Sequence, residues 1–256
     1  MLRKDRYHEG HVRGNLLLNN VLGAHTFLVE LETYAKKGQR QLTAELAERV
    51  VAQGLCKNPF VIPVGGSVTT GVWGNCVISS GSVLLTFPKG YICMMQELAA
   101  QLGDAPADVI FFATGSGGTA AGLAVARALC PAFAATRVVG YAVCDSPEYF
   151  YQHVEHEFAQ LGLPPESVRG LIEFRDAKNA GYAVSTPAET ELIRRVARSS
   201  GILLDGAYTG KAVFGFVRDA EEFAGKRCLF VHTGGAFSLF GMPPGVIVDP
   251  SLVSDF

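Results

Sequence analysis

The sequence has no apolar stretch long enough to cross a bilayer. Its longest apolar runs are strand-sized and interrupted by glycine, proline or charge, whereas a spanning helix needs about 20 apolar residues. With 22 basic and 24 acidic side chains, the net charge is only −2, so neither nucleic acid nor an anionic membrane is expected as a partner. The N-terminus lacks the apolar core of a secretory signal. We expect a cytoplasmic protein, with an organellar address left open.

The six cysteines show no metal-binding or redox spacing. They are scattered, without a Cys-x-x-Cys pair, and we interpret them as free thiols of a reducing compartment. We expect no metal site, and we find no repeats or low-complexity linkers. Apolar material is plentiful: 48% of the 256 residues are hydrophobic, enough for the core of one large domain or two small ones.

Apolar runs and amphipathic segments alternate along the chain. The runs predict strands at residues 25–31, 60–67, 108–113, 137–143 and 227–233. Helical spacing, in several cases ended by a glycine, predicts helices at residues 16–24, 42–54, 91–103, 188–201 and 211–223. Because parallel neighbours require crossover connections, this order predicts an α/β fold with open, mainly parallel, twisted sheets and flanking helices.

The segment FATGSGGTAAG, residues 112–122, joins a predicted strand to a helix-like run. Its small residues present several unhindered backbone N–H groups at the positive end of a helix dipole. Ser116 and Thr119 add hydroxyl donors that suit a terminal phosphate. The segment therefore predicts a phosphate-binding loop. A second interpretation stays open, in which the glycines only let the strand and the helix pack closely.

Two kinds of ligand fit such a loop. Gly115, Gly117 and Ala120 satisfy the dinucleotide pattern Gly-x-Gly-x-x-Ala, with Asp145 as the candidate ribose-binding acid. Against a dinucleotide, Asp145 follows the glycines by more than the usual spacing of about 20 residues. The other candidate is a cofactor with a single phosphate, such as pyridoxal phosphate.

Further motifs favour the second candidate. They are RGNLLLNNVLGA (13–24), PVGGS (63–67), GYAVSTPAE (181–189), LLDGAYTGKAVFG (203–215) and FVHTGG (230–235). In this order the chain resembles the family of 1-aminocyclopropane-1-carboxylate deaminases and D-cysteine desulfhydrases. These are pyridoxal phosphate enzymes with a tryptophan synthase β-like fold, and the resemblance extends from about Arg13 to Gly241.

The resemblance implies a set of cofactor-binding residues. The loop that holds the cofactor phosphate corresponds to Thr114, Gly115, Ser116, Gly117, Gly118 and Thr119. Thr209 corresponds to the residue that faces the pyridine nitrogen, and His232 and Thr233 to a loop near the cofactor ring. A neutral hydroxyl at Thr209 leaves that nitrogen largely unprotonated, whereas glutamate would favour protonation. The resemblance implies glutamate at this position in the deaminases that open the cyclopropane ring and threonine in the desulfhydrases. We therefore expect a small D-amino acid, such as D-cysteine, as substrate.

Tyr182 and Tyr208 match tyrosines that flank the substrate in the family, which makes them the candidate catalytic residues. A phenol with a pKa near 10 needs the cofactor's field or a hydrogen bond before it acts as a base. The alternative for each is a buried tyrosine with a satisfied hydroxyl. A structural histidine at the end of a strand is the alternative for His232.

The sequence departs from the family in two places. The Schiff-base lysine of the family lies in an N-terminal segment with no counterpart here, and Lys211 matches a family lysine that does not carry the cofactor. Residues 75–90 interrupt the family pattern, either as a surface hairpin or, as we favour, as translated intron or a faulty gene model. We therefore divide the chain into residues 1–74, the remainder of a smaller domain; residues 75–90, an atypical insertion; and residues 91–256, mostly the larger cofactor-binding domain.

The resulting expectation has two parts. The complete protein would be a pyridoxal phosphate-dependent lyase of the D-cysteine desulfhydrase type, releasing pyruvate, ammonia and sulfide, and this chain would be inactive because it lacks the lysine. The alternatives are a 1-aminocyclopropane-1-carboxylate deaminase, a nicotinamide-dependent oxidoreductase and a non-catalytic relative. A homodimer is the expected assembly, by analogy with the family.

Overall fold

The computed structural model describes residues 2–4, 7, 12–62, 64–66, 89–103, 105–242 and 247. The chain divides into two compact units, Met1–Gly66 and Ser67–Phe256, and each is described by itself. The predicted domain limits stay predictions: residues 74 and 75 lie outside the described part, and residues 90 and 91 lie within one helix, Lys89–Leu102. Residues 75–88 of the predicted insertion also lie outside the described residues.

The first unit holds two short parallel strands and two helices. These are β1 (Leu2–Arg3), α1 (Gly14–Val21), β2 (Leu28–Val29) and α2 (Leu31–Ala52), followed by a 3₁₀ turn, Val64–Gly66. The strand predicted at 25–31 is reduced to two residues because α2 begins at Leu31. The strand predicted at 60–67 is wrong for its described residues, since Gly65 and Gly66 have φ of 71° and 59°, and extended backbone has negative φ.

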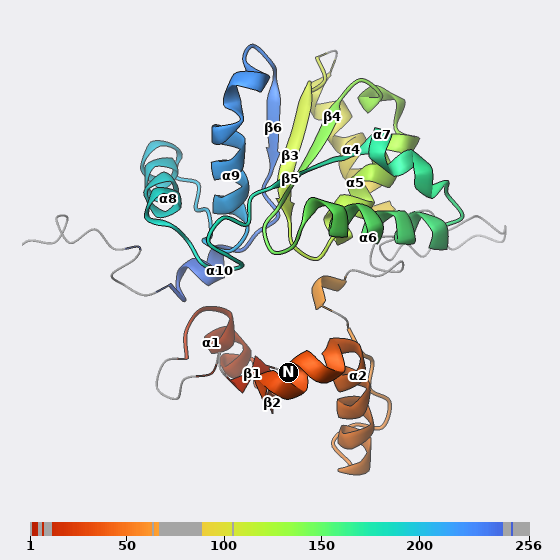
Figure 1. The fold of residues 1–256 in the computed structure, drawn as a ribbon, viewed down its shortest axis with the longest axis vertical. Coiled ribbons are helices and arrows are strands. Elements are labelled where there is room, and N and C mark those ends of the chain that lie inside the picture. Colours follow the sequence, from red (N-terminus) through yellow and green to blue (C-terminus); the bar gives the residue numbers. More distant parts are fainter. Residues whose placement is uncertain are drawn as a thin grey trace, which may run out of the picture. The chain divides into compact units, whose positions relative to one another are not determined.

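The second unit is built on a four-stranded parallel sheet. Its strands are β3 (Val109–Thr114), β4 (Arg137–Ala142), β5 (Glu173–Asp176) and β6 (Cys228–Val231), in the order β5-β4-β3-β6. Val109 of β3 lies opposite Arg137 of β4 and Cys228 of β6. The four strands lie side by side in Figure 1. The parallel α/β fold predicted from the sequence is confirmed.

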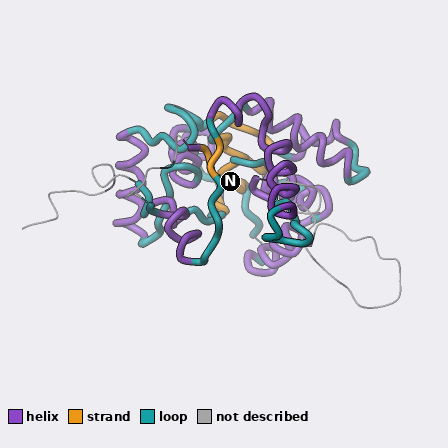
Figure 2. The backbone as a smooth tube through the Cα atoms, turned by 90° about the horizontal axis from the view of Figure 1, so that it is seen from below, coloured by secondary structure: helices purple, strands orange, loops and turns teal. Residues whose placement is uncertain are grey.

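Helices cover both faces of this sheet. The helices of this unit are α4 (Lys89–Leu102), α5 (Gly118–Leu129), α6 (Pro147–Gln160), α7 (Val168–Leu171), α8 (Pro187–Ser200), α9 (Thr209–Arg218) and α10 (Ala236–Leu239). Figure 2 shows the strands of this sheet, in orange, between helices. The prediction missed α6 and β5, and the helix predicted at 211–223 ends at Arg218 before a 3₁₀ turn, Ala220–Phe223.

Strand β3 contributes side chains to two separate cores. Ile110 and Phe112 pack with α4, α5 and α6 on one face, and Val109, Phe111 and Ala113 pack with α9 on the other. All six residues of the strand are buried, as expected for a central strand of a parallel sheet covered on both faces. The sheet therefore provides a rigid base for the loops that follow its strands.

Two general features of the described residues bear on the class of protein. No helix among them combines the length and the hydropathy that a membrane span requires. Within the same residues, no group of three histidine, cysteine or acidic side chains is placed to hold a metal ion.

Gly140 in β4 offers a test of the packing between β3 and β5. A Cβ atom at this position would lie 2.6 Å from Thr114 Oγ1 and 2.9 Å from the ring of Phe174. We expect Gly140→Ala to lower the free energy of unfolding by about 1–3 kcal/mol, measured by urea denaturation, because overpacking displaces both neighbours. Gly170→Ala, where a Cβ meets nothing within 4 Å, is the matched control. Equal stability of the two variants would contradict the packing described.

Candidate cofactor site at the carboxyl edge of the sheet

The parallel strands bring several loops to one edge of the sheet. The glycine loop follows β3, Cys144 follows β4, the segment with Tyr182 follows β5, and His232 follows β6. Ligand sites in open α/β sheets lie outside the carboxyl ends of the strands. This edge therefore collects residues that were predicted from motifs far apart in the sequence.

The glycine loop leads directly into α5. Gly117 is the N-cap, with a left-handed φ of 92°, and α5 begins at Gly118. Among the described residues no side-chain cap is found at this end, and the first turn of α5 holds no acidic residue. The first N–H groups of a helix have no partner inside the helix, and the helix dipole makes them attractive to an anion. The geometry thus suits a phosphate.

Two glycines of the loop also make room for neighbouring side chains. A Cβ on Gly115 would lie 2.5 Å from Tyr208 Cε1, and one on Gly117 would collide with the ring of His153 in α6. Close packing and phosphate binding, the two interpretations of the glycines, are therefore compatible. The packing also places Tyr208 directly against the loop.

The hydroxyl residues of the loop differ in their surroundings. Thr114 is buried, and its Oγ1 has no hydrogen-bond partner among the described residues. The Oγ1 atom of Thr119 lies 2.7 Å from the hydroxyl of Tyr91 in α4. Ser116 and Gly118 are half-buried. The loop is also fixed by Cys144, whose Sγ donates to the Gly115 carbonyl at 3.0 Å, and burial raises the pKa of this thiol.

The turn that starts α9 is organised around a buried carboxylate. Asp205 accepts hydrogen bonds of 2.8–2.9 Å from the backbone N–H groups of Ala207, Tyr208 and Thr209. It also accepts from Thr209 Oγ1 at 2.7 Å and from Ser238 Oγ at 3.2 Å. The hydroxyl of Thr209 accepts in turn from the Asp205 N–H at 2.8 Å. Thr209 is fully buried, so its hydroxyl proton is directed at Asp205.

The two predicted tyrosines meet at this edge. Their hydroxyl groups are hydrogen-bonded to each other, and their rings pack edge to face with centroids 5.7 Å apart. Tyr182 is 45% exposed. Burial and the bond from Tyr182 raise the pKa of Tyr208 well above its usual value. The Tyr208 phenol is therefore neutral at physiological pH and acts as a hydrogen-bonding group.

The loop after β6 is tied to the same turn. His232 Nε2 lies 3.0 Å from the Leu203 carbonyl, and Nδ1 accepts from the Gly234 N–H at 3.2 Å. Both ring nitrogens thus have backbone partners, which matches the structural alternative for this histidine. Thr233 is exposed. A Cβ on Gly235 would lie 2.7 Å from Asp205 Oδ1, so this glycine lets the loop approach the carboxylate.

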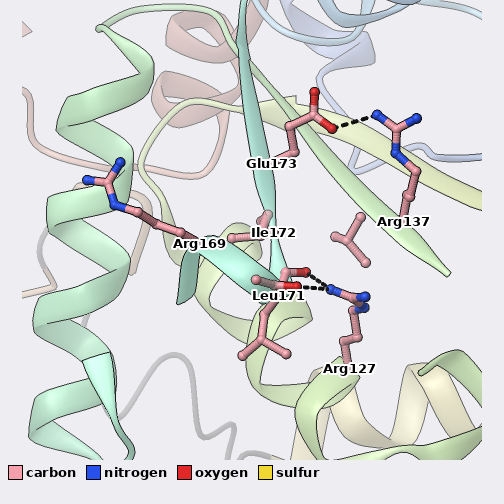
Figure 3. Close-up of a pocket in the computed structure, with 8 residues that line it drawn as sticks. Arg127, Arg137, Arg169, Leu171, Ile172 and Glu173 are labelled. Atoms are coloured by element: carbon pink, nitrogen blue, oxygen red, sulfur yellow. Dashed lines mark hydrogen bonds and ion pairs between the residues drawn. The ribbon is translucent and has the colours of Figure 1, made fainter. Parts of the chain in front are cut away.

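A hollow of about 160 Å³ lies elsewhere, beside the first residues of β4 and β5. Three arginines line it (Figure 3), but each is bonded to other groups. Arg127 donates to the carbonyls of residues 170 and 171, Arg137 pairs with Glu173, and Arg169 pairs with Glu148. This hollow is at the opposite edge from the glycine loop and contains none of the predicted site residues.

Comparison with known proteins agrees with this geometry. Residues 7–234 match the family described as pyridoxal-phosphate dependent enzymes, and the chain therefore belongs to that family. It is 36% identical over 235 residues to the mitochondrial bifunctional D-cysteine desulfhydrase/1-aminocyclopropane-1-carboxylate deaminase of Arabidopsis thaliana, covering 89% of this chain and 53% of that protein.

Other relatives narrow the assignment. D-cysteine desulfhydrase of Yersinia pestis (strain Pestoides F) is 33% identical over 240 residues, covering 91% of this chain and 66% of that protein. The crystal structure of an ACC deaminase homologue aligns with a TM-score of 0.69 and 28% identity, covering 93% of this chain and 66% of that one. Within the pyridoxal phosphate enzymes, the chain belongs to the 1-aminocyclopropane-1-carboxylate deaminase and D-cysteine desulfhydrase family. It spans about half to two thirds of the length of these relatives.

The cofactor of this family fits the site. The start of α5 suits its phosphate, and Tyr208, the partner of Tyr182, packs against Gly115 of the same loop. Sequence reasoning missed Tyr91, Cys144, His153 and Asp205, which shape the site by supporting the predicted residues. Only Asp205 carried a local signal, since an aspartate before glycine favours a turn in which its side chain bonds the following backbone.

The role of Asp205 can be tested by Asp205→Asn. The asparagine amide replaces one carboxylate oxygen by an NH₂ group. Because every hydrogen bond to the Asp205 carboxylate comes from a donor, at least one of these bonds is replaced by a repulsive contact between two donors. We expect the free energy of unfolding to fall by about 3 kcal/mol in urea denaturation, because bonds to a buried charge are lost. Asp145→Asn is the control, since Asp145 accepts a bond from the Ser146 N–H next to it. A loss no larger than that of the control would show that the turn does not depend on the carboxylate.

Proposed function

We propose that the complete protein is a pyridoxal phosphate-dependent lyase of the D-cysteine desulfhydrase type. The observation that carries this proposal is the start of α5, which follows β3 through a glycine loop whose Gly115 packs against Tyr208, the partner of Tyr182. When bound, pyridoxal phosphate supplies an electron sink for the bonds at the substrate's α-carbon. In the complete protein, the residues described here would bind the cofactor and orient the substrate.

The phosphate would be held by the loop of residues 114–119. Backbone N–H groups at the start of α5 supply the donors, and the helix dipole adds attraction for the negative charge. The Thr119 hydroxyl can contribute after rotating away from Tyr91, its partner at 2.7 Å. Thr209 would be the neutral partner of the cofactor's pyridine nitrogen, and its buried hydroxyl, which now donates to Asp205 Oδ1, would have to turn away from Asp205 to donate to that nitrogen.

The tyrosine pair would orient the substrate. One hydroxyl of a bonded pair donates to the other, which leaves one proton for an external acceptor. Because the pKa of Tyr208 is raised, its phenol keeps its proton at neutral pH, and the pair can donate one hydrogen bond to a substrate carboxylate. The half-exposed position of Tyr182 makes it the member that a substrate reaches first.

D-cysteine is our proposed substrate, and 1-aminocyclopropane-1-carboxylate is the second candidate. Thr209 supports the first, because a neutral partner of the pyridine nitrogen suits the elimination of a good leaving group better than the opening of a carbon ring. The name of the Arabidopsis thaliana relative includes both activities. A homodimer in the cytoplasm or in an organelle remains the expected setting.

The cofactor class is tested by titration with pyridoxal phosphate and, separately, with NADH. We expect tight binding of pyridoxal phosphate, detected by absorbance and fluorescence, and no tight binding of NADH. Gly117→Ala should raise the Kd for pyridoxal phosphate about tenfold or more, because the methyl group collides with His153 and strains the loop. Gly162→Ala is the matched control, since Gly162 has φ of 71° and open space around it. Tight NADH binding that Gly117→Ala abolishes would favour the nicotinamide alternative.

We further propose that this chain holds the cofactor without a covalent bond. Lys211 is fully buried, and its ammonium group donates to three acceptors. Borohydride reduction of the loaded protein, followed by peptide mass mapping, should therefore yield no pyridoxyl-lysine. Sulfide release from D-cysteine, and ammonia release from 1-aminocyclopropane-1-carboxylate, should stay at the background of the free cofactor. An adduct at any of the eight lysines, or sustained sulfide release, would overturn this proposal.

A further inference from the structure

The segment between β5 and α8 carries Tyr182 in an unfavourable backbone conformation. Asn179 and Ala183 have left-handed φ values of 48° and 57°, which are uncommon for residues other than glycine. The segment itself contains two turn bonds, from the Gly181 N–H to the Lys178 carbonyl and from the Val184 N–H to the Gly181 carbonyl. Such strain persists only where the surroundings hold the backbone in place.

Lys211 holds the two ends of this segment together. Its Nζ donates to the Lys178 carbonyl at 3.0 Å and to the Val184 carbonyl at 2.8 Å. These carbonyls lie on either side of Tyr182 in the chain. The third donor of the ammonium group goes to Glu189 Oε1 at 3.1 Å. All three protons of the ammonium are thus used.

Placing the Lys211 ammonium group at this position costs free energy, which indicates that the residue has a specific role. A cation in the first turn of α9 opposes the helix dipole, and the pair with Glu189 has exposed side-chain fractions of 0% and 1%. A buried pair of this kind adds little net stability over apolar replacements. The pair instead fixes relative positions, because one ammonium group binds three acceptors that belong to different parts of the chain.

Glu189 connects the same ammonium to the start of α8. Its carboxylate accepts from the Thr186 N–H at 2.6 Å and from Asn179 Nδ2 at 2.8 Å, and the Thr186 hydroxyl accepts from the Glu189 N–H at 3.2 Å. Burial acts to raise the pKa of Glu189, but the bonds from Thr186, Asn179 and Lys211 outweigh it and lower the pKa. The carboxylate therefore stays ionised beside the ammonium.

We propose that Lys211 is a positioning residue, which holds Tyr182 against Tyr208 by joining the carbonyls of residues 178 and 184 to the first turn of α9. Tyr208 is the N-cap of this helix and Lys211 lies in its first turn. One turn of helix therefore positions one tyrosine directly and the other through the ammonium group. The catalytic meaning of the pair rests on the proposed function, whereas the geometric claim does not.

The test uses the ligand-free chain with tyrosine labelled with ¹³C at Cζ. The Tyr182 and Tyr208 signals are assigned with Tyr182→Phe and Tyr208→Phe. We expect Lys211→Met to shift or broaden both signals and to leave that of Tyr149 in α6 unchanged. Amide hydrogen exchange in residues 178–184 should accelerate about tenfold or more, since the segment loses its link to α9. Lys226→Met, which removes an exposed lysine, is the control and should change neither.

A double variant separates positioning from stability. Lys211→Met with Glu189→Gln removes both charges and keeps an amide that can accept from the Thr186 N–H. We expect it to recover much of the Tm lost in Lys211→Met, because no unpaired charge stays buried, while both tyrosine signals remain shifted. Wild-type tyrosine signals and exchange rates in either folded variant would overturn the inference. If the wild-type chain fails to bind pyridoxal phosphate but the tyrosine signals respond as expected, the proposed function fails and the positioning role stands.

Discussion

The parallel direction of the four strands is the constraint on which this site depends. Because β3, β4, β5 and β6 all run the same way, the residues that follow them lie at one edge of the sheet. The glycine loop, Cys144, the segment with Tyr182 and the loop with His232 each follow a different strand. An antiparallel arrangement of the same strands would send half of these groups to the opposite edge.

The helix starts around this edge differ in how their N–H groups are satisfied. The start of α6 is capped by the Ser146 side chain, and that of α8 by Thr186 in a reciprocal capping box with Glu189. By contrast, α5 begins after a left-handed glycine and has no side-chain cap from the described part of the chain. The N–H groups that a side chain satisfies at the start of α6 and of α8 therefore lack such a cap at the start of α5, next to the end of β3. The tyrosine pair and the Asp205 turn then pack around that end, as expected for a preformed site.

The sequence predicted the parts of this arrangement that depend on local pattern. The apolar run of β3 and the glycine stop of α8 at Gly201 are local signals, and the corresponding elements formed as predicted. The prediction of a strand at residues 60–67 was wrong because it relied on the apolar composition of the segment. The segment contains two adjacent glycines with positive φ, which a sequence pattern does not reveal. The helix α6 and the strand β5 were missed because their apolar residues are interrupted by charged ones, which long-range packing tolerates.

The contacts that support the site could not be predicted from the sequence. That Gly115 faces Tyr208 and Gly117 faces His153 depends on how α6 and α9 pack on the sheet, and no local pattern contains that information. The surroundings of Glu189, a partner of Lys211, could be predicted in part from the sequence. Thr186 and Glu189 have the spacing of a capping box, which indicates where α8 begins, but not that its glutamate would also face a buried ammonium.

The double role of Glu189 restricts how this region can change during evolution. The same carboxylate caps the start of α8 and pairs with the Lys211 ammonium in α9. Replacing Glu189 by an apolar residue therefore removes the cap and leaves a buried cation unpaired. Relatives that have lost the lysine are free to keep a neutral cap at this position, whereas relatives that keep the lysine must retain an acid. Positions 189 and 211 are therefore expected to covary among homologues, although 21 other residues separate them in the chain.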